Sequence, residues 1–282
     1  MKNYLSLIKF SHTIFALPFA LIGFFLAYPN GNFSINILIY VLLCMIFARS
    51  AAMAFNRYID REIDTINPRT SKTREIPNKK IKASSALAFI ILNSFLFVTT
   101  TYFINQLCFF LSPLALLIIL GYSYTKRFTS LCHLILGVGL SLSPIGAYLA
   151  VTETFDRVPI IFSLIVLFWV AGFDIIYSLQ DEEFDAKNNL KSIPVFCGKK
   201  NALIVAKLLH SATVILIVYV GWLFDNFYVL YWGGAFIFSA LLVFQHSIIS
   251  KDDLSRINIA FFTTNGIASV VFGVFVILDI LI

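Results

Sequence analysis

Long apolar runs constrain this chain more than any other feature of its sequence. Each run has close to the roughly 20 residues that an α-helix needs to cross the hydrocarbon core of a bilayer. Only 13% of the 282 residues are charged, about half the usual share in soluble domains. No run alternates apolar and polar residues as a barrel strand does. The sequence therefore predicts an all-α, polytopic membrane helical bundle of about nine transmembrane helices.

The predicted spans leave two long polar loops, at about 60–83 and 181–200, inside one membrane domain that covers residues 1–282. The start, with Lys2 before an apolar stretch, resembles a signal peptide. That stretch is long, contains Pro18 and precedes eight more runs, so we interpret it as an uncleaved first helix. The predicted spans are 10–28, 36–59, 84–104, 107–125, 131–151, 158–180, 201–223, 226–247 and 257–280.

The basic residues gather on one side of the predicted membrane. Of the 21 Lys and Arg, only Arg49, within a span, and Arg157, in a short connection, lie away from the long-loop face. Basic residues concentrate in cytoplasmic loops, so we expect an inner (plasma) membrane protein with a cytoplasmic amino terminus. This topology accounts for the net charge of +6, and we expect the bilayer, not nucleic acid, as the partner.

The cysteines and histidines show no pattern typical of a metal site. The cysteines form no CxxC or Cys/His spacing, so we expect reduced thiols and neither a zinc site nor a disulfide framework. They are Cys44, Cys108, Cys132 and Cys197. The histidines are scattered, and we predict that none of them is a ligand. They are His12, His133, His210 and His246.

Two acidic segments about 120 residues apart resemble each other. Each follows a predicted span, carries Asp-x-x-x-Asp and leads into a long basic loop. The first runs from Asn56 to Asp64 and the second from Tyr177 to Asp185. This echo predicts two related halves, with functional groups that meet between them at the cytoplasmic face.

Residues four apart lie on one helix face, about 6 Å apart along the axis. Asn56, Asp60 and Asp64 therefore form one oxygen-lined column, the first stripe, and Asp181 and Asp185 form the second stripe. We expect each stripe at a helix C-terminus, where the macrodipole disfavours anions. Loop Lys and Arg could offset these charges. Two copies at one face favour Mg²⁺ instead, which takes one or two carboxylates plus substrate phosphate oxygens.

Basic residues near both stripes suit a diphosphate that a metal bridges, because Lys and Arg bind the outer phosphate oxygens. The positive-inside bias alone explains many of them. They are Arg69, Lys72, Arg74, Lys79, Lys80, Lys126, Arg127, Lys187 and Lys191.

Two charged residues lie deeper, because Arg49 and Asp174 each precede a stripe by seven residues on the same helix face. Intramembrane charges are costly and mark functional sites. Two interpretations stay open. The two residues pair with each other or with neighbours, or Arg49 binds the carboxylate of a second substrate. Tyr177 and Gln180 lie near this face and could orient that substrate by hydrogen bonding.

These motifs resemble the two signatures of UbiA-type aromatic prenyltransferases. The resemblance continues in segments 69–74, 124–129 and 191–194 and, with nine spans, covers the whole chain. Arg57 stands where the first signature often has another Asp, which removes one possible metal ligand. N-x-x-x-D-x-x-x-D covers Asn56, Asp60 and Asp64, and D-x-x-Y-x-x-Q-D-x-x-x-D covers Asp174, Tyr177, Gln180, Asp181 and Asp185.

The resemblance implies a reaction in which a polyprenyl group leaves its diphosphate and an electron-rich aromatic ring attacks the carbocation. Phe- and Leu-rich walls would exclude water that quenches the cation. It implies Mg²⁺ ligands at Asp60, Asp64, Asp181 and Asp185, which with Tyr177 and Gln180 form the predicted catalytic set. The implied substrate-binding residues are Asn56, Arg49, Arg74, Lys126, Arg127, Asp174 and Lys191.

The opening from Lys9 to Phe19 resembles the branch labelled 4-hydroxybenzoate polyprenyltransferase. That branch is also associated with prenylation of a dihydroxynaphthoate in the futalosine route to menaquinone. Both acceptors are aromatic acids, which agrees with Arg49 at the cavity, and both stay open.

Three other interpretations deserve comparison. Haem O synthase and chlorophyll synthase share the Asp-rich signatures and differ in the acceptor. CDP-alcohol phosphotransferases have a single Asp cluster with obligatory glycines, which this sequence lacks. A cation transporter would need carboxylates near mid-span and broken helices in both halves, whereas these four carboxylates lie at one membrane face.

Overall fold

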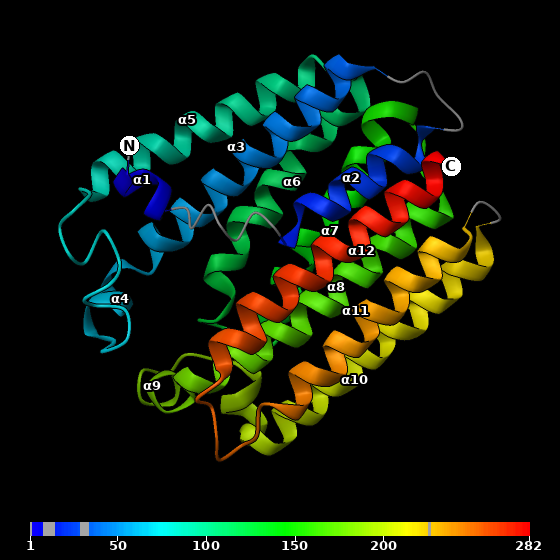
Figure 1. Ribbon diagram of the computed structural model, residues 1–282. Helices are drawn as coiled ribbons and strands as arrows, with labels where there is room; N and C mark the ends of the chain where they lie inside the picture. The colour runs from blue at the N-terminus through cyan, green and yellow to red at the C-terminus, as the bar shows by residue number, and fades with distance from the viewer. Residues whose placement is uncertain (1, 8–14, 29–33, 225–226) are drawn as a thin grey trace. The chain divides into compact units, whose positions relative to one another are not determined.

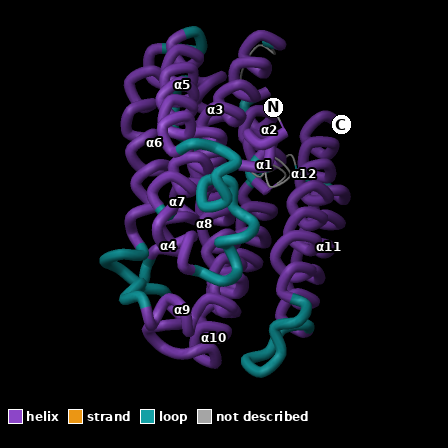
Figure 2. The backbone as a smooth tube through the Cα atoms, turned by 90° about the vertical axis from the view of Figure 1, so that its left-hand side faces the viewer, coloured by secondary structure: helices purple, strands orange, loops and turns teal. Residues whose placement is uncertain are grey.

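The computed structural model describes residues 2–7, 15–28, 34–224 and 227–282, and every regular element among them is a helix (Figures 1 and 2). The chain divides into two compact units. Unit 1 comprises Met1–Thr13 and Ile35–Tyr124, and unit 2 comprises Ile14–Ser34 and Thr125–Ile282. The first stripe therefore belongs to unit 1 and the second stripe to unit 2.

Unit 1 is built around α3, which packs along α5 (Figure 1). Its core includes Ala54 of α3 with Ala86 and Ile90 of α5, and Leu7 of α1 is fully buried against them. Small residues on α3 let the two helices approach closely, as is usual in membrane bundles. The helices are α1 (Lys2–Leu7), α3 (Ile35–Ile59), α4 (Arg61–Ile66), α5 (Ala83–Tyr102) and α6 (Gln106–Thr125).

Unit 2 is centred on α8, which packs against both α7 and α10, while α11 lies beside α12 (Figure 2). The elements are α2 (Leu17–Leu26), α7 (Cys132–Thr152), α8 (Arg157–Ser178), η3 (Leu179–Asp181), α9 (Glu182–Lys187), α10 (Ile193–Leu223), α11 (Val229–Ser247), the π-helix η4 (Ile259–Thr264) and α12 (Asn265–Leu281).

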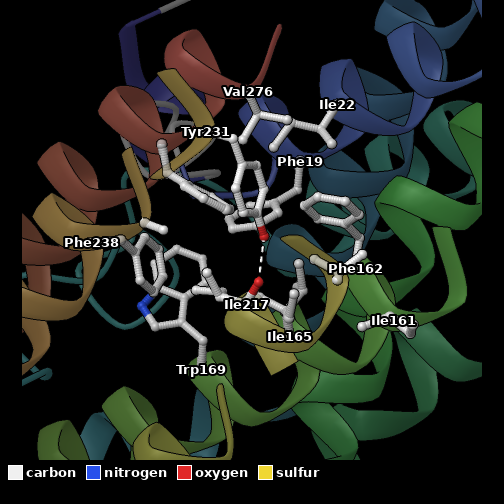
Figure 3. Close-up of a cluster of buried hydrophobic side chains, with 14 of the residues drawn as sticks. Phe19, Ile22, Ile161, Phe162, Ile165, Trp169, Ile217, Tyr231, Phe238 and Val276 are labelled. Carbon is white, nitrogen blue, oxygen red and sulfur yellow. Dashed lines mark hydrogen bonds between the residues drawn. The ribbon is translucent and has the colours of Figure 1, made fainter. Parts of the chain in front are cut away.

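The core of unit 2 is rich in aromatic side chains. Trp169 of α8 is fully buried, and its ring centroid lies 5.3 Å from that of Phe19 and 5.5 Å from that of Phe238. The Tyr231 hydroxyl lies in the same cluster and donates to the Ile217 carbonyl at 2.5 Å (Figure 3). That hydrogen bond satisfies the one polar atom that the tyrosine brings into the core.

Glycine allows α2 to lie directly on α7. A Cβ atom on Gly23 would sit 2.0 Å from the Pro144 carbonyl oxygen, so no larger residue fits this crossing. Pro144 lies inside α7 and leaves the Leu140 carbonyl without its backbone amide donor, and the Ser143 hydroxyl donates to that carbonyl at 2.8 Å.

Eight helices of the described chain are long and apolar enough to cross a membrane. They confirm the all-helical membrane bundle and the last eight predicted spans. The first predicted span falls partly on residues 8–14, which lie outside the described residues, and its described part includes the ten-residue α2.

Helix α10 begins at Ile193, eight residues before the predicted start at residue 201, but it consists of two helical pieces that meet at a kink. The Ser192 side chain accepts from the Val195 amide, and Pro194 occupies the first turn, where its missing N–H costs nothing. Gly198 then breaks the helical path with φ 78° and ψ 159°. Lys199 and Lys200 follow this kink, so the predicted start at residue 201 lies close to the start of the longer helical piece.

Candidate active site

The first stripe lies where α3 gives way to α4. Asp60, with φ −87° and ψ 4°, separates the two helices. The backbone nevertheless continues its four-residue bonding, from the Asp60 amide to the Asn56 carbonyl at 3.0 Å and from the Asp64 amide to the Asp60 carbonyl at 2.7 Å. The side chains stay in one column, in which the Asn56 amide Nδ2 donates to Asp60 Oδ2 at 3.3 Å.

The carboxylates of the first stripe are almost completely buried. Asp60 is 2% exposed and Asp64 is 4% exposed. Arg74, from the loop after α4, places its Nη1 atom 2.6 Å from Asp64 Oδ2. Buried carboxylates need such a partner, because an isolated charge in this environment is very costly. Unit 1 thus supplies positive charge to its own stripe.

Arg57 is buried between the residues of the first stripe, at 8% exposure, and its Nη1 atom donates to Asn56 Oδ1 at 3.1 Å. Asn56 therefore accepts a hydrogen bond from Arg57 and donates one to Asp60. The arginine that replaces a possible metal ligand in the sequence fixes the orientation of a neighbour of the stripe.

The second stripe also lies at a helix break. Helix α8 ends at Ser178, a 3₁₀ turn covers Leu179–Asp181, and α9 begins at Glu182. Asp181 precedes α9 and Asp185 lies in its first turn, and both are partly exposed.

The prediction that both stripes sit at helix C-termini is wrong in one respect. Asp60 and Asp181 directly precede the six-residue helices α4 and α9, and Asp64 and Asp185 lie in the first turns of these helices. Acidic side chains are favoured at helix N-termini by the helix dipole. Asp64 and Asp185 therefore lie at the end of a helix where negative charge is favoured, and not at a C-terminus.

Tyr177 and Gln180 shape the turn between α8 and the second stripe. Gln180 Nε2 donates to the Tyr177 carbonyl at 2.9 Å. The Tyr177 ring packs on Phe261 of the π-helix, with ring centroids 4.1 Å apart. π-Helical turns frequently occur at functional sites. The Gln180 amide nitrogen thus binds the backbone in this structure.

Three predicted phosphate-binding residues come together in unit 2. The Lys191 amide donates to the Lys126 carbonyl at 2.6 Å, and Lys191 Nζ donates to the Phe128 carbonyl at 3.2 Å. These bonds hold the segment before α10 against the segment that connects α6 and α7, in which Arg127 directly follows Lys126. The structure thus joins two motifs that are about 60 residues apart in sequence.

The sequence gives no indication of the partner of Asp174, which is His133 of α7. His133 Nδ1 lies 2.7 Å from Asp174 Oδ2, and the histidine side chain is 4% exposed. Among the described residues the carboxylate of Asp174 pairs with this histidine, which is a neighbour within unit 2. One feature of the sequence could have predicted such a partner: Asp174 lies within a predicted span, and an intramembrane carboxylate needs a partner.

Arg49 lies within α3 and its Nε atom is buried without a hydrogen-bond partner among the described residues. A buried guanidinium with an unused donor is costly unless something else binds it.

The remaining histidines differ in their surroundings. His210 and His246 pair in unit 2, with His210 Nδ1 2.9 Å from His246 Nε2, and His210 Nε2 donates to the Trp169 carbonyl at 3.2 Å. His12 lies outside the described residues. Within the described ranges no three or more His, Cys, Asp or Glu side chains group so as to hold a metal ion, and no described cysteine forms a disulfide.

Comparison with known proteins identifies the family. Residues 16–267 match the model of the UbiA prenyltransferase family. The chain belongs to that family. Its resemblance in sequence is therefore confirmed, and this UbiA family member is a multi-pass membrane enzyme, a prenyltransferase. The transporter and CDP-alcohol phosphotransferase interpretations are set aside.

Curated relatives of this UbiA family member share about a third of its residues. A 4-hydroxybenzoate octaprenyltransferase of Yersinia enterocolitica is 32% identical over 250 residues, which are 86% of this chain and 83% of the relative. A 4-hydroxybenzoate octaprenyltransferase of Photobacterium profundum is 27% identical over 277 residues, which are 96% of this chain and 94% of the relative.

Solved structures share the fold of this UbiA family member. The apo structure of a UbiA homolog from Aeropyrum pernix K1 is 29% identical, with a TM-score of 0.85 and coverage of 95% of this chain and 98% of that one. A UbiA homolog from Archaeoglobus fulgidus bound to GPP and Mg²⁺ is 24% identical, with a TM-score of 0.77 and coverage of 99% and 100%.

Proposed function

We propose that this UbiA family member transfers a polyprenyl group from a polyprenyl diphosphate to an aromatic acid in quinone biosynthesis. The acceptor is 4-hydroxybenzoate or a dihydroxynaphthoate. The observation that carries the donor side is the pair of buried carboxylates, Asp60 and Asp64, aligned in one column. The names of the curated relatives support the acceptor side.

The donor set of each stripe fits Mg²⁺. Each stripe offers two carboxylates four residues apart, and Mg²⁺ usually takes one or two carboxylates plus phosphate oxygens and water. In our proposal each stripe binds Mg²⁺ through its own pair, Asp60 with Asp64 and Asp181 with Asp185, and Asn56 orients Asp60 through their hydrogen bond. Bound there, Mg²⁺ would stabilise the negative charge that develops on the leaving diphosphate.

The basic residues serve the same leaving group. We assign Lys126, Arg127 and Lys191 to the outer phosphate oxygens, because backbone bonds already hold their segments together in unit 2. Arg74 combines two roles, since it neutralises Asp64 and its guanidinium fork has further donors for phosphate.

We assign the binding of the aromatic acid to Arg49 and Asp174, two charged residues within the predicted spans. Arg49 has a buried donor that a carboxylate would satisfy. Asp174 is held by His133 on one oxygen, and we assign its other oxygen to the ring hydroxyl of the acceptor. Tyr177 and Gln180 complete the catalytic set by shaping the turn that leads from Asp174 to Asp181.

The whole chain serves as a single membrane domain in this proposal. The inner (plasma) membrane location, with a cytoplasmic amino terminus, follows from the positive-inside distribution of Lys and Arg. Diphosphate and aromatic acid would then arrive from the cytoplasm, while the isoprenoid tail stays in lipid.

The test is a panel assay with the purified full chain in detergent, Mg²⁺ and radiolabelled geranyl diphosphate. The acceptors are 4-hydroxybenzoate, 1,4- and 1,6-dihydroxynaphthoates, and haem B as the alternative that has no phenolic hydroxyl. Mass spectrometry should find the prenyl group on a carbon of an aromatic acid. A product with haem B alone would overturn the acceptor and leave the family assignment intact.

A further inference from the structure

His133 connects three helices of unit 2 through one imidazole ring. Its Nδ1 atom contacts Asp174 of α8 at 2.7 Å, and its Nε2 atom accepts from the Ile193 amide, at the start of α10, at 3.4 Å. The ring itself belongs to α7 and is 3% exposed. Both ring nitrogens are therefore used, although the sequence offered no reason to give this residue a role.

The two contacts assign the tautomer of His133. The Ile193 amide has only a proton to offer, so Nε2 carries a lone pair and the ring proton is on Nδ1. Nδ1–H then donates to Asp174 Oδ2, which acts as the acceptor. A neutral imidazole in this tautomer satisfies a buried backbone amide and a carboxylate at the same time.

The bridge leaves part of Asp174 accessible. The Asp174 side chain is 24% exposed, whereas that of His133 is 4% exposed, so the carboxylate has an open side and the histidine does not. Among the described residues Asp174 has no second hydrogen-bond partner. One oxygen is fixed by His133 and the other can accept a hydrogen bond from a bound molecule.

The hydrogen bond from the Ile193 amide to His133 starts two residues after Lys191. Cys132 Sγ, next to His133, contacts the Lys191 carbonyl at 3.5 Å. Ser192 caps α10 between Lys191 and Ile193. The ring thus joins the segment assigned to the diphosphate to the carboxylate assigned to the acceptor.

We propose that His133 is a positioning residue for the aromatic acceptor: it fixes one oxygen of Asp174, so that the other oxygen accepts the hydrogen bond of the acceptor's ring hydroxyl. This inference rests on the proposed function, because it assigns a purpose to Asp174. Prenyl transfer to an electron-rich ring requires that the ring carbon face the allylic carbon, and a fixed hydroxyl sets that orientation.

The decisive experiment measures both KM values in His133→Leu, His133→Gln and a matched control. Leucine has the volume of the ring and no hydrogen bonds, so the KM for the aromatic acid should rise about tenfold, with the KM for the diphosphate within about twofold. Glutamine can donate to Asp174 and accept from Ile193, so it should restore most of the loss. His246→Gln, the same substitution at another histidine of unit 2, should leave both KM values within about twofold.

A double-mutant cycle separates positioning from general damage. If His133 acts through Asp174, His133→Leu should add little to Asp174→Asn, because the second substitution has nothing left to disturb. The proposal would be overturned if the effects of His133→Leu and Asp174→Asn multiplied in the double variant. It would also be overturned if His133→Leu raised both KM values equally. A loss of activity in His133→Gln as large as in His133→Leu would overturn it as well.

Nitrogen NMR of the wild-type chain, labelled at histidine, provides a readout independent of activity. The unprotonated ring nitrogen of His133 should be Nε2, identified by the signal that disappears in His133→Gln. Protonation of Nε2 in the wild type would overturn the assignment. A wild-type chain that prenylates none of the aromatic acids would refute the proposed function, whereas normal turnover with unchanged acceptor KM in His133→Leu would refute only this inference.

Discussion

The two acidic stripes have the same spacing and the same kind of helix break, but different surroundings. In unit 1, Asp60 and Asp64 are almost fully buried, and Arg74 pairs with Asp64. In unit 2, Asp181 and Asp185 are partly exposed on a 3₁₀ turn and a short helix. One sequence pattern therefore provides a buried, internally paired site in one unit and a more open one in the other.

In our proposal this difference gives the two stripes different roles in binding the diphosphate. A buried carboxylate with a fixed partner is preorganised, which favours a permanent binding role for the first stripe. A partly exposed pair on a short helix can adjust to an arriving diphosphate. The helix breaks matter in both cases, because they place the aspartates at the start of a helix, where negative charge is tolerated.

The largest expected effect tests whether both stripes are essential. Asp60→Ala and Asp181→Ala should each lower kcat by about 10²–10³-fold, as loss of a group that stabilises transition-state charge does. Glu62→Ala and Glu183→Ala are matched controls, since these exposed carboxylates lie between the aspartates and off the stripes. Radiolabelled prenyl transfer measures the effect. Activity above about a tenth of wild type in either Asp variant would contradict an essential role for its stripe.

Arg74→Met tests the internal pairing of the first stripe. Removal of one partner of a buried ion pair costs about 3 kcal/mol, because the remaining carboxylate is left without compensation. The melting temperature Tm in detergent should fall, and kcat/KM should fall about 10²-fold because Asp64 is no longer held in place. Added Mg²⁺ should raise Tm more in the variant than in wild type, since the cation takes over the neutralisation. An equal Mg²⁺ shift in both would mean that Arg74 and the metal do not share Asp64.

Arg49→Ala tests the deeper charge of unit 1. We expect the KM for the aromatic acid to rise about tenfold while the KM for the diphosphate changes little, because Arg49 is assigned to the acceptor's carboxylate. Steady-state kinetics with each substrate varied in turn measures both values. Arg49→Lys, which keeps the charge and loses the planar fork, serves as the graded control. Equal increases in both KM values would contradict the assignment.

The smallest effect is expected at a partly exposed ion pair beside the second stripe. Lys199 Nζ lies 3.5 Å from Glu182 Oε2, with side-chain exposures of 29% and 23%. A partly exposed pair of this kind is worth less than ~1 kcal/mol. Lys199→Ala should therefore change kcat/KM by less than about twofold and barely alter Tm. A loss comparable to that of Arg74→Met would mean that the Lys199–Glu182 pair supports the second stripe as strongly as Arg74 supports the first.

Much of this architecture could be predicted from the sequence. The lengths of the apolar runs gave eight of the spans, because lipid forces nearly every spanning segment to be a long helix with all its backbone bonds made internally. The spacing of Asn56, Asp60 and Asp64 gave their common column, because four residues make about one helical turn. The matching motifs also gave the family.

Only the tertiary structure decided which side chains meet. The pairing of Asp174 with His133 and the contact of Lys191 with the Phe128 carbonyl join residues distant in sequence, and the pairing of Asp64 with Arg74 depends on the path of the loop between them. Periodicity determines the face of a helix on which a residue lies, since that follows from local geometry. It does not determine which face of another helix will be packed there, because that depends on how the side chains of both helices fit together.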